Sequence, residues 1–283
     1  MYLQTTSSPV VQAEPTWPLR RPLFDIQIDA VTMAEAVALL ADWVRSSATT
    51  CRYVVTPNVD HIVLLQQDAG LRAAYADAGL VVADGWPIVR ASRWLGQPLP
   101  ERVAGSDLVP RLFDCFARRE SLRVFLLGAA PGVAERAAAR IRTTWPGVEV
   151  TGCYSPPLGF EHDADENQAI LAHIAAARPD VLIVGFGAPK QELWVHRHRQ
   201  ELQAKIALCA GATIDFLAGQ RHRAPPWMRR AGLEWLHRML SEPRRLVRRY
   251  ARDAIVFPRL VIHAWFATRR PARPNDAPAS HHQ

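Results

Sequence analysis

Residues 56 to 89 read TPNVDHIVLLQQDAGLRAAYADAGLVVADGWPIV, and two short apolar runs, Tyr53–Val55 and Leu80–Ala83, have the composition of strands. Each run ends abruptly in polar residues: TPN follows the first, and Asp84 with Gly85 follows the second. In parallel α/β proteins, ligands bind just beyond the carboxyl ends of strands. The stretch therefore predicts that the Asp84 carboxylate points into a cleft, and the alternative is an aspartate that only caps a helix.

The same alternation of apolar strand and amphipathic helix continues along the chain. A capping box of Thr32 and Glu35 predicts the start of the first helix, and Gly79 is the expected C-cap residue of a later one. This alternation predicts an α/β, Rossmann-like fold with a mainly parallel sheet and helices on both faces. The expected strands are 24–28, 52–55, 80–83, 123–127, 148–153, 181–184 and 206–209, and the expected helices include 32–45, 71–78, 106–119, 133–142 and 165–177.

Length and composition indicate a soluble globular protein with one sizeable core. The chain has 283 residues, of which 49% are hydrophobic and 22% charged. Its four cysteines lie far apart without a CxxC pair, which favours a reducing cytoplasm. The N-terminus lacks the apolar region of a signal peptide. We expect a flexible tail over 1–22, an α/β domain over 23–220, a basic helical appendage over 221–268 and a disordered tail over 269–283.

The net charge of +7 comes from the appendage. Between Gly219 and Tyr250 there are nine of the 34 basic residues and two of the 27 acidic ones, which leaves 25 of each elsewhere. Such a segment seeks phosphate groups, on a nucleic acid, an anionic bilayer or a diphosphate substrate. It predicts a basic helix over 227–240, and Ser241 is expected to cap a second helix. The apolar run IVFPRLVIHAWFA is too short to cross a bilayer, so it either lies in the interface or packs on the body.

Three further patterns leave alternatives open. The turn GAAPG over 128–132 suits either a nucleotide phosphate or a plain βα connection, since it lacks both GxGxxG and a Walker lysine. Gly185, Lys190 and Gln191 form a second such turn, suited to a diphosphate or to a solvated helix start. Asp163-Ala-Asp165 spells DxD, but acidic residues also gather at helix N-termini, and convergent metal ligands are missing from this stretch.

Eight ordered motifs over about residues 24 to 250 resemble the WecG/TagA/CpsF family of glycosyltransferases. In order they are TPNVDHIVLLQQD, VVADGWPIV, ERVAGSDL, VFLLGAAPGVAE, YSPPLGF, PDVLIVGFGAPKQELWV, CAGATIDFLAGQRHRAPPWM and GLEWLHRMLSEPRRLVRRY. The N-terminal tail and the apolar extension after Arg252 are not covered by the resemblance.

The resemblance implies site residues. It implies that Asp84 is the catalytic base and that no metal or cofactor is required. The expected substrate-binding residues are Thr56, Asn58, Arg102, Tyr154, Gly185, Lys190, Gln191, Arg221 and Arg223. Among these, Gln191 is expected near the donor pyrophosphate and Arg102 near phosphate or acceptor.

The resemblance also implies an activity. It implies an inverting transfer of a hexose or N-acetylhexosamine from a UDP-sugar to a polyprenyl-diphosphate-linked sugar, in the synthesis of exopolysaccharide, capsule or cell-wall polymer. The enzyme would sit on the cytoplasmic face of the membrane as a peripheral protein, with the appendage on an anionic surface and without nucleic acid. A homo-oligomer is one alternative for its assembly. The rival hypotheses are a nucleic-acid- or membrane-binding module that uses the arginine-rich segment, and a nucleotide-cofactor oxidoreductase, which the missing GxGxxG fingerprint disfavours.

Overall fold

The computed structural model describes residues 19–47, 50–117, 120–221, 223–225, 227–228 and 231–269. The predicted tails, 1–22 and 269–283, lie outside these ranges except for residues 19–22 and 269. In chain order the strands are β1 Arg20–Leu23, β2 Ile26–Asp29, β3 Arg52–Val55, β4 Leu80–Val81, β5 Leu122–Gly128, β6 Val148–Tyr154, β7 Val181–Gly185 and β8 Ile206–Cys209. The helices are α1 Met33–Arg45, α2 Val59–Leu65, α3 Ala69–Ala76, α4 Trp86–Trp94, α5 Gly105–Phe116, α6 Val133–Thr144, α7 Ala164–Ala177, α8 Lys190–His198, α9 Thr213–Leu217, α11 Glu234–Ser241 and α12 Pro243–Arg269.

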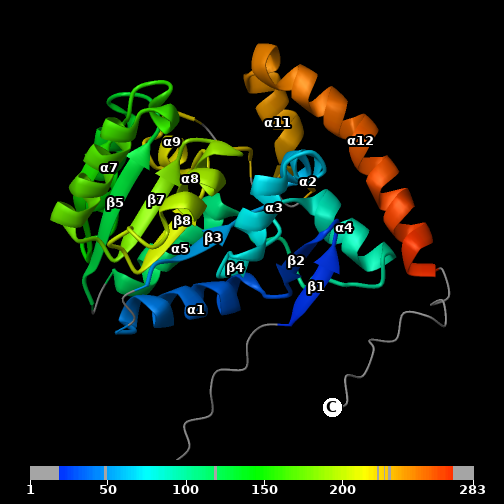
Figure 1. Cartoon of the computed structure of the whole chain (residues 1–283), viewed down its shortest axis with the longest axis horizontal. Helices are drawn as coiled ribbons and strands as arrows, with labels where there is room; N and C mark the ends of the chain where they lie inside the picture. The colour runs from blue at the N-terminus through cyan, green and yellow to red at the C-terminus, as the bar shows by residue number, and fades with distance from the viewer. Residues whose placement is uncertain are drawn as a thin grey trace, which may run out of the picture.

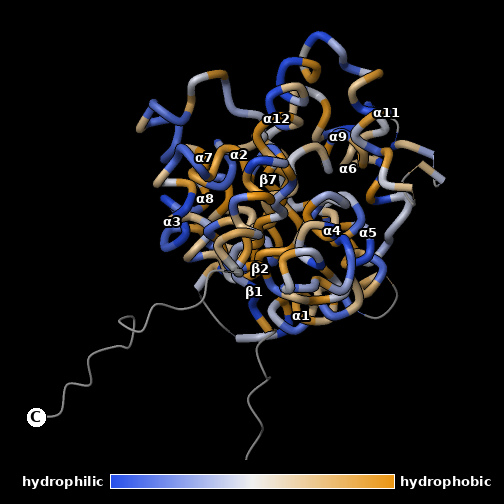
Figure 2. The backbone as a smooth tube through the Cα atoms, turned by 90° about the vertical axis from the view of Figure 1, so that its right-hand side faces the viewer, coloured by the Kyte–Doolittle hydropathy of each residue, from blue (hydrophilic) through white to orange (hydrophobic). Residues whose placement is uncertain are grey.

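Six strands form one parallel sheet in the order β4-β3-β8-β7-β5-β6, which confirms the predicted α/β class (Figure 1). Alternate residues of each strand face opposite sides of the sheet. One face packs against α2, α3, α4, α7 and α8, and the other against α1, α5, α6 and α9. The hydrophobic segments accordingly concentrate at the strands in the interior (Figure 2).

The predicted strand over 24–28 is wrong in detail, because the chain turns back within it. Phe24 and Asp25 have φ of 54° and 64°, and they form the two-residue turn of an antiparallel hairpin between β1 and β2. The predicted tail boundary at residue 22 therefore falls inside β1. Phe24 is buried and its ring centroid lies 5.4 Å from that of Phe257. This tertiary contact stabilises a turn that contains neither glycine nor asparagine.

Two predicted helix caps also differ from the structure. The helix α3 ends at Ala76 with Asp77 as its C-cap, and Gly79 instead donates its N–H to the Tyr53 carbonyl at 2.9 Å, next to β4. Ser241 is the last residue of α11, where its hydroxyl donates to the His237 carbonyl at 2.8 Å, so it does not cap the following helix.

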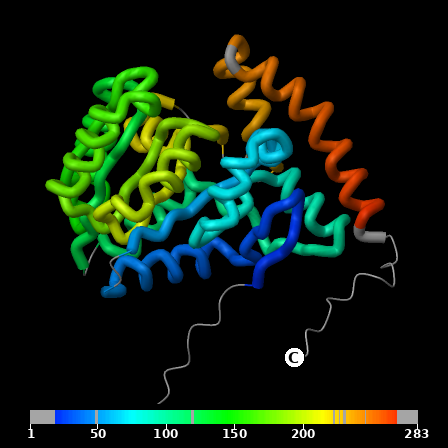
Figure 3. The backbone as a smooth tube through the Cα atoms, viewed as in Figure 1, coloured from blue at the N-terminus to red at the C-terminus, as the bar shows by residue number. Residues whose placement is uncertain are grey.

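The C-terminal segment folds into α11 and the long α12. The predicted basic helix over 227–240 is not continuous: residues 227–228 are helical, residues 231–232 form a turn, and α11 begins at Glu234, while 229–230 lie outside the described residues. Helix α12 runs through the apolar segment and lies beside α2 (Figures 1 and 3). Its buried residues include Leu246, Asp253 and Phe257, and Phe257 belongs to the hydrophobic core of the body. Of the two alternatives for the apolar run, packing on the body is therefore observed for one side of the helix. No helix in the described ranges has the length and apolarity to cross a membrane.

Candidate active site

A cavity of about 560 Å³ lies beyond the carboxyl ends of the strands, between the sheet and the C-terminal helices. Its walls are the segments that follow β3, β4, β7 and β8, together with α11 and α12. This is the position at which ligands bind in open α/β sheets. Among the polar residues that line it are Thr56, Asn58, Asp60, His61, Asp84, Arg102, Gln191, Thr213, Asp215, Arg221, Glu234, Arg238, Arg249, Tyr250 and Asp253.

Asp84 follows β4 as predicted and lines the cavity. Its backbone N–H donates to the Pro57 carbonyl at 2.8 Å, which joins the segments that follow β3 and β4. The side chain keeps 27% exposure. Burial raises the pKa of Asp84 from its usual 3.8 to about 6, and Arg102 opposes this shift. A carboxyl group with such a pKa, open to a cavity, suits proton abstraction near neutral pH.

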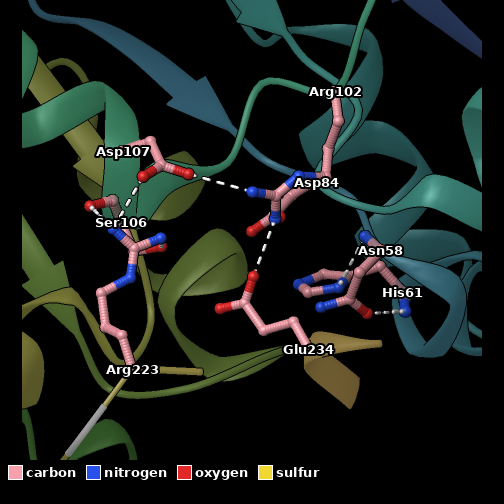
Figure 4. A network of polar contacts seen from close by, with 8 residues as sticks. All are labelled: Asn58, His61, Asp84, Arg102, Ser106, Asp107, Arg223 and Glu234. Carbon is pink, nitrogen blue, oxygen red and sulfur yellow. Dashed lines mark hydrogen bonds and ion pairs between the residues drawn. The ribbon is translucent and has the colours of Figure 1, made fainter. Parts of the chain in front are cut away.

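Arg102 lies beside Asp84 and is shared by three carboxylates. Its guanidinium lies 3.0 Å from Asp107, 3.1 Å from Glu234 and 3.4 Å from Asp84 (Figure 4). Because Arg102 is only 14% exposed, these contacts are weakly screened by solvent. Arg102 lines the cavity, and its expected contact with phosphate or acceptor stays a prediction. Glu234, which also contacts Arg102, was not singled out from the sequence.

Thr56 and Asn58 shape the wall that follows β3. The Thr56 hydroxyl donates to the Cys209 carbonyl at 3.4 Å, and this contact joins β3 to β8. The Asn58 side chain accepts from the N–H groups of Asp60 and His61, so it is the N-cap of α2. His61 completes a reciprocal cap, because its Nδ1 accepts from the Asn58 N–H at 3.3 Å. Both predicted residues line the cavity, and both are also anchored by structural hydrogen bonds.

Gln191 is buried at 2% exposure and joins two glycine turns. Its Oε1 accepts from the N–H groups of Gly187 and Gly211, each at 3.2 Å. Its Nε2 donates to Glu192 Oε1 at 2.8 Å. The amide is therefore engaged with protein atoms on both ends, and its evident role is to hold the segments that follow β7 and β8 at the cavity wall.

The remaining residues expected around the β7 turn lie in different places. Gly185 lines the cavity, and a Cβ there would lie 3.0 Å from Ile214 Cδ1, so the wall is closely packed. Lys190 Nζ contacts Glu161 at 2.6 Å, away from the cavity lining. The Tyr154 hydroxyl donates to Glu166 at 2.7 Å and is likewise not part of that lining.

The two expected appendage arginines follow α9 and line different cavities. Arg221 lines the cavity and pairs with Glu242 at 2.9 Å and Asp215 at 3.6 Å. Arg223 contacts Asp107 at 2.7 Å and lines a second cavity of about 210 Å³. Arg223 does not line the main cavity. It is linked to Arg102, and through Arg102 to Asp84, because Arg223 and Arg102 both contact the Asp107 carboxylate.

Five polar lining residues of α11 and α12 were not singled out from the sequence as site residues: Glu234, Arg238, Arg249, Tyr250 and Asp253. The only signal for them was the cluster of arginines, which did not indicate which members face inward. Arg249 Nε lies 3.2 Å from Asp60, at the contact between α12 and α2. The C-terminal helices thus bring cations to the side of the cavity opposite the sheet.

The open glycine and DxD patterns have structural explanations here. Gly128 has φ of 102°, and a Cβ on it would lie 2.9 Å from the Gly185 backbone. The turn over 128–132 allows close strand packing and does not line the main cavity. Asp163 is the N-cap of α7 and accepts from the N–H of Asp165 at 3.0 Å. Within the described ranges, no group of three or more His, Cys, Asp or Glu side chains could hold a metal ion.

Comparisons with known proteins agree with the motifs. A family model described as "Glycosyl transferase WecG/TagA/CpsF family" matches residues 21–271. An N-acetylglucosaminyldiphosphoundecaprenol N-acetyl-beta-D-mannosaminyltransferase of Bacillus spizizenii is 34% identical over 193 residues, which cover 68% of this chain and 72% of the relative. The protein of the same name from Staphylococcus aureus is 28% identical over 226 residues, covering 80% of this chain and 86% of the relative.

Proposed function

The chain belongs to the WecG/TagA/CpsF family of glycosyltransferases, and we propose that it moves a hexose or N-acetylhexosamine from a UDP-sugar to a sugar on a polyprenyl diphosphate. The observation that carries the proposal is one cavity in which a carboxyl group of raised pKa, Asp84, faces arginines from the sheet side and from the C-terminal helices. The names of the relatives favour N-acetylmannosamine as the first sugar to test and N-acetylglucosaminyl diphosphoundecaprenol as the first acceptor.

In the proposed reaction, Asp84 takes the proton from the acceptor hydroxyl. The acceptor oxygen then forms a bond to the anomeric carbon of the donor while the bond from that carbon to the diphosphate breaks. UDP leaves with the electron pair of that bond. Attack from the side opposite the leaving group inverts the anomeric configuration. The raised pKa of Asp84 supports this role, because a general base works best when its pKa lies near the working pH.

The leaving diphosphate gains negative charge as the bond breaks, so the site must supply positive charge. Arg221, Arg238 and Arg249 line the cavity and are the candidates. Guanidinium groups hold phosphate oxygens through paired N–H donors. Preorganised donors of this kind stabilise developing charge without a metal ion. We therefore propose a metal-independent reaction, in which these arginines balance the charge on UDP.

The site also needs access to a lipid-linked acceptor. The cavity is closed on one side by α11 and α12, whose outer surface is basic and partly apolar. We propose that this surface rests on the cytoplasmic face of the membrane, where the acceptor headgroup can reach Asp84. The polymer to which the product contributes is exopolysaccharide, capsule or a cell-wall polymer.

The proposal is tested by incubating the full chain with a panel of UDP-sugars and synthetic polyprenyl-diphosphate-linked N-acetylglucosamine. We expect one UDP-sugar to give a disaccharide lipid with release of UDP, and the rate to be unchanged by excess EDTA. Failure with every donor on the panel would contradict the proposed substrate class. Loss of activity in EDTA, restored by a divalent ion, would contradict metal independence alone.

A further inference from the structure

The three carboxylates around Arg102 lie at different distances from its guanidinium, and Asp84 is the farthest of them. Nη2 of Arg102 lies 3.0 Å from Asp107, and Nη1 lies 3.1 Å from Glu234. The distance from Nη1 to Asp84 is longer, at 3.4 Å. Both terminal nitrogens of the guanidinium thus have a closer carboxylate than Asp84. Figure 4 shows Glu234 approaching the guanidinium from the side of the C-terminal helices.

The position of Glu234 is fixed by packing between α11 and the segment that follows Asp84. Gly232 has φ of 75°, and a Cβ on it would lie 3.1 Å from the Trp86 ring. The turn that precedes α11 therefore approaches the start of α4 more closely than a residue with a Cβ would comfortably allow. The Trp235 ring stacks edge-on against Tyr250 of α12 at a centroid distance of 6.2 Å. Glu234 is the first residue of α11, between these two contacts, and its side chain is 17% exposed.

The charges that face Asp84 come from several elements. Arg102 precedes α5, Asp107 belongs to α5, Glu234 and Arg238 belong to α11, and Arg223 follows α9. His61 of α2 faces the same cavity. Without Glu234, one N–H of Arg102 would have Asp84 as its nearest carboxylate. A carboxylate in a tight ion pair binds a proton less readily, which makes it a weaker base.

We propose that Glu234 is a positioning residue: it pairs with Arg102 and prevents a closer ion pair between Arg102 and Asp84. The Asp84 carboxylate can then accept a proton from the acceptor hydroxyl. The inference rests on the proposed function in assigning the base to Asp84. It also explains why a helix of the C-terminal segment carries an acidic residue into a cavity that we propose binds a diphosphate. Docking of α11 then completes the site through Glu234 as well as through the arginines.

The test is the variant Glu234→Gln, which keeps the shape of the side chain and removes its charge. The Asp84 carboxyl group is titrated by ¹³C NMR, with Asp84→Asn used to assign its signal. In the native chain we expect a pKa of about 6. In Glu234→Gln the repulsion disappears and Arg102 moves closer, so both effects lower the pKa, by roughly one unit or more. We expect kcat at pH 7.5 to fall roughly tenfold while the KM for the UDP-sugar changes less than about twofold.

Controls separate this role from a structural one. Glu149→Gln removes a carboxylate that is 61% exposed on β6, and it should change neither the titration nor kcat. Glu234→Asp keeps the charge but withdraws it by one methylene, so it should give an intermediate shift and remains informative if the glutamine variant unfolds. An unchanged or higher pKa of Asp84 in both variants would overturn the inference. The titration needs no substrate, so a native chain that transfers no sugar would contradict the proposed function without deciding the role of Glu234.

Discussion

The Asp84 carboxyl group loses hydration when the chain folds, and this destabilises the ionised form. Its pKa rises from 3.8 to about 6, so the folded state binds a proton more tightly than the unfolded state between these values. The free energy of unfolding therefore falls as pH rises through this window, and the loss stays constant above about pH 6. A shift of this size corresponds to at most about 3 kcal/mol.

The variant Asp84→Asn should accordingly be more stable and inactive. At pH 7.5 we expect its melting temperature to rise by roughly 5 °C, while transfer falls by at least about 100-fold and UDP binding is retained. Below about pH 3 the gain in stability should vanish, because the native carboxyl group is then neutral in both the folded and the unfolded state. Calorimetric melting across pH, together with UDP titration, checks this. Full transfer activity in the variant would contradict the assignment of the base.

Gln191 was expected near the donor pyrophosphate, and in the structure its side chain holds the backbone of two glycine turns. Its amide holds the N–H groups of Gly187 and Gly211, so truncation would leave both without their acceptor. We expect Gln191→Ala to lower the free energy of unfolding by about 1–3 kcal/mol and to raise the KM for the UDP-sugar more than it lowers kcat. Denaturant unfolding and steady-state kinetics check this. A large fall in kcat at unchanged stability would instead favour direct contact with the diphosphate.

The sequence predicted the site residues that follow strands and missed those that come from distant helices. Asp84 and Thr56 could be placed because the end of a buried strand is visible as a change from apolar to polar residues. Glu234 could not, because an acidic residue in the first turn of a basic helix has an ordinary explanation in the helix dipole. Only the fold shows that this turn lies beside Arg102.

Among the elements, helix α12 depends on α2 for its position. Asp60 of α2 is 5% exposed and accepts from Arg252 at 2.5 Å and contacts Arg249 at 3.2 Å. Asp253 lies beside them, and burial together with the charge of Asp60 raises its pKa. One carboxylate thus anchors two arginines of the helix that closes the cavity.

Loss of this anchor should loosen α12 without unfolding the sheet. In Asp60→Asn we expect amide hydrogens over residues 243–269 to exchange faster, and the overall stability to fall by about 1–2 kcal/mol, since the arginines remain partly hydrated. Hydrogen exchange followed by mass spectrometry checks this. Asp42→Asn, at a pair whose aspartate is 76% exposed, is the matched control and should exchange as the native chain does. Uniform acceleration throughout the sheet would indicate general destabilisation instead.

Elements set by local chemistry were predicted well, and elements set by tertiary contact were not. The Thr32–Glu35 capping box is present, and β3 and β8 begin and end where expected. The β1–β2 hairpin was missed because its turn depends on Phe24 packing against Phe257 of α12. No pattern near residue 24 contains information about a residue more than 200 positions away.

At the scale of the whole molecule, the parallel sheet brings the functional segments together. The segments after β3, β4, β7 and β8 meet at one edge because these four strands are neighbours in the order β4-β3-β8-β7. Alternation of strands and helices predicted the parallel class, whereas the strand order depends on which crossovers the chain makes. The cavity therefore could be expected at a strand edge, but its exact set of walls required the structure.

Helix α12 has a second face, which is turned away from the body. This face carries exposed apolar residues and exposed arginines. The apolar residues are Val247, Ile255, Ile262 and Phe266, and the arginines are Arg244, Arg248 and Arg259. Apolar residues together with arginines are the composition of helices that lie in a bilayer interface. Since the inner face of the same helix closes the cavity, contact with a membrane would place the lipid-linked acceptor beside the site.

This face predicts binding to anionic vesicles, and the prediction separates a membrane surface from a nucleic acid as the partner. We expect sedimentation with phosphatidylglycerol vesicles but not with phosphatidylcholine, and no salt-dependent binding to duplex DNA. Each arginine contributes about 1 kcal/mol at an anionic surface, so Arg248→Ala with Arg259→Ala should weaken binding roughly 30-fold. Ile262→Asn with Phe266→Asn should also weaken it. The control Leu158→Asn changes a fully exposed apolar residue outside α12, and an equal loss in that variant would show that the vesicles do not recognise this helix.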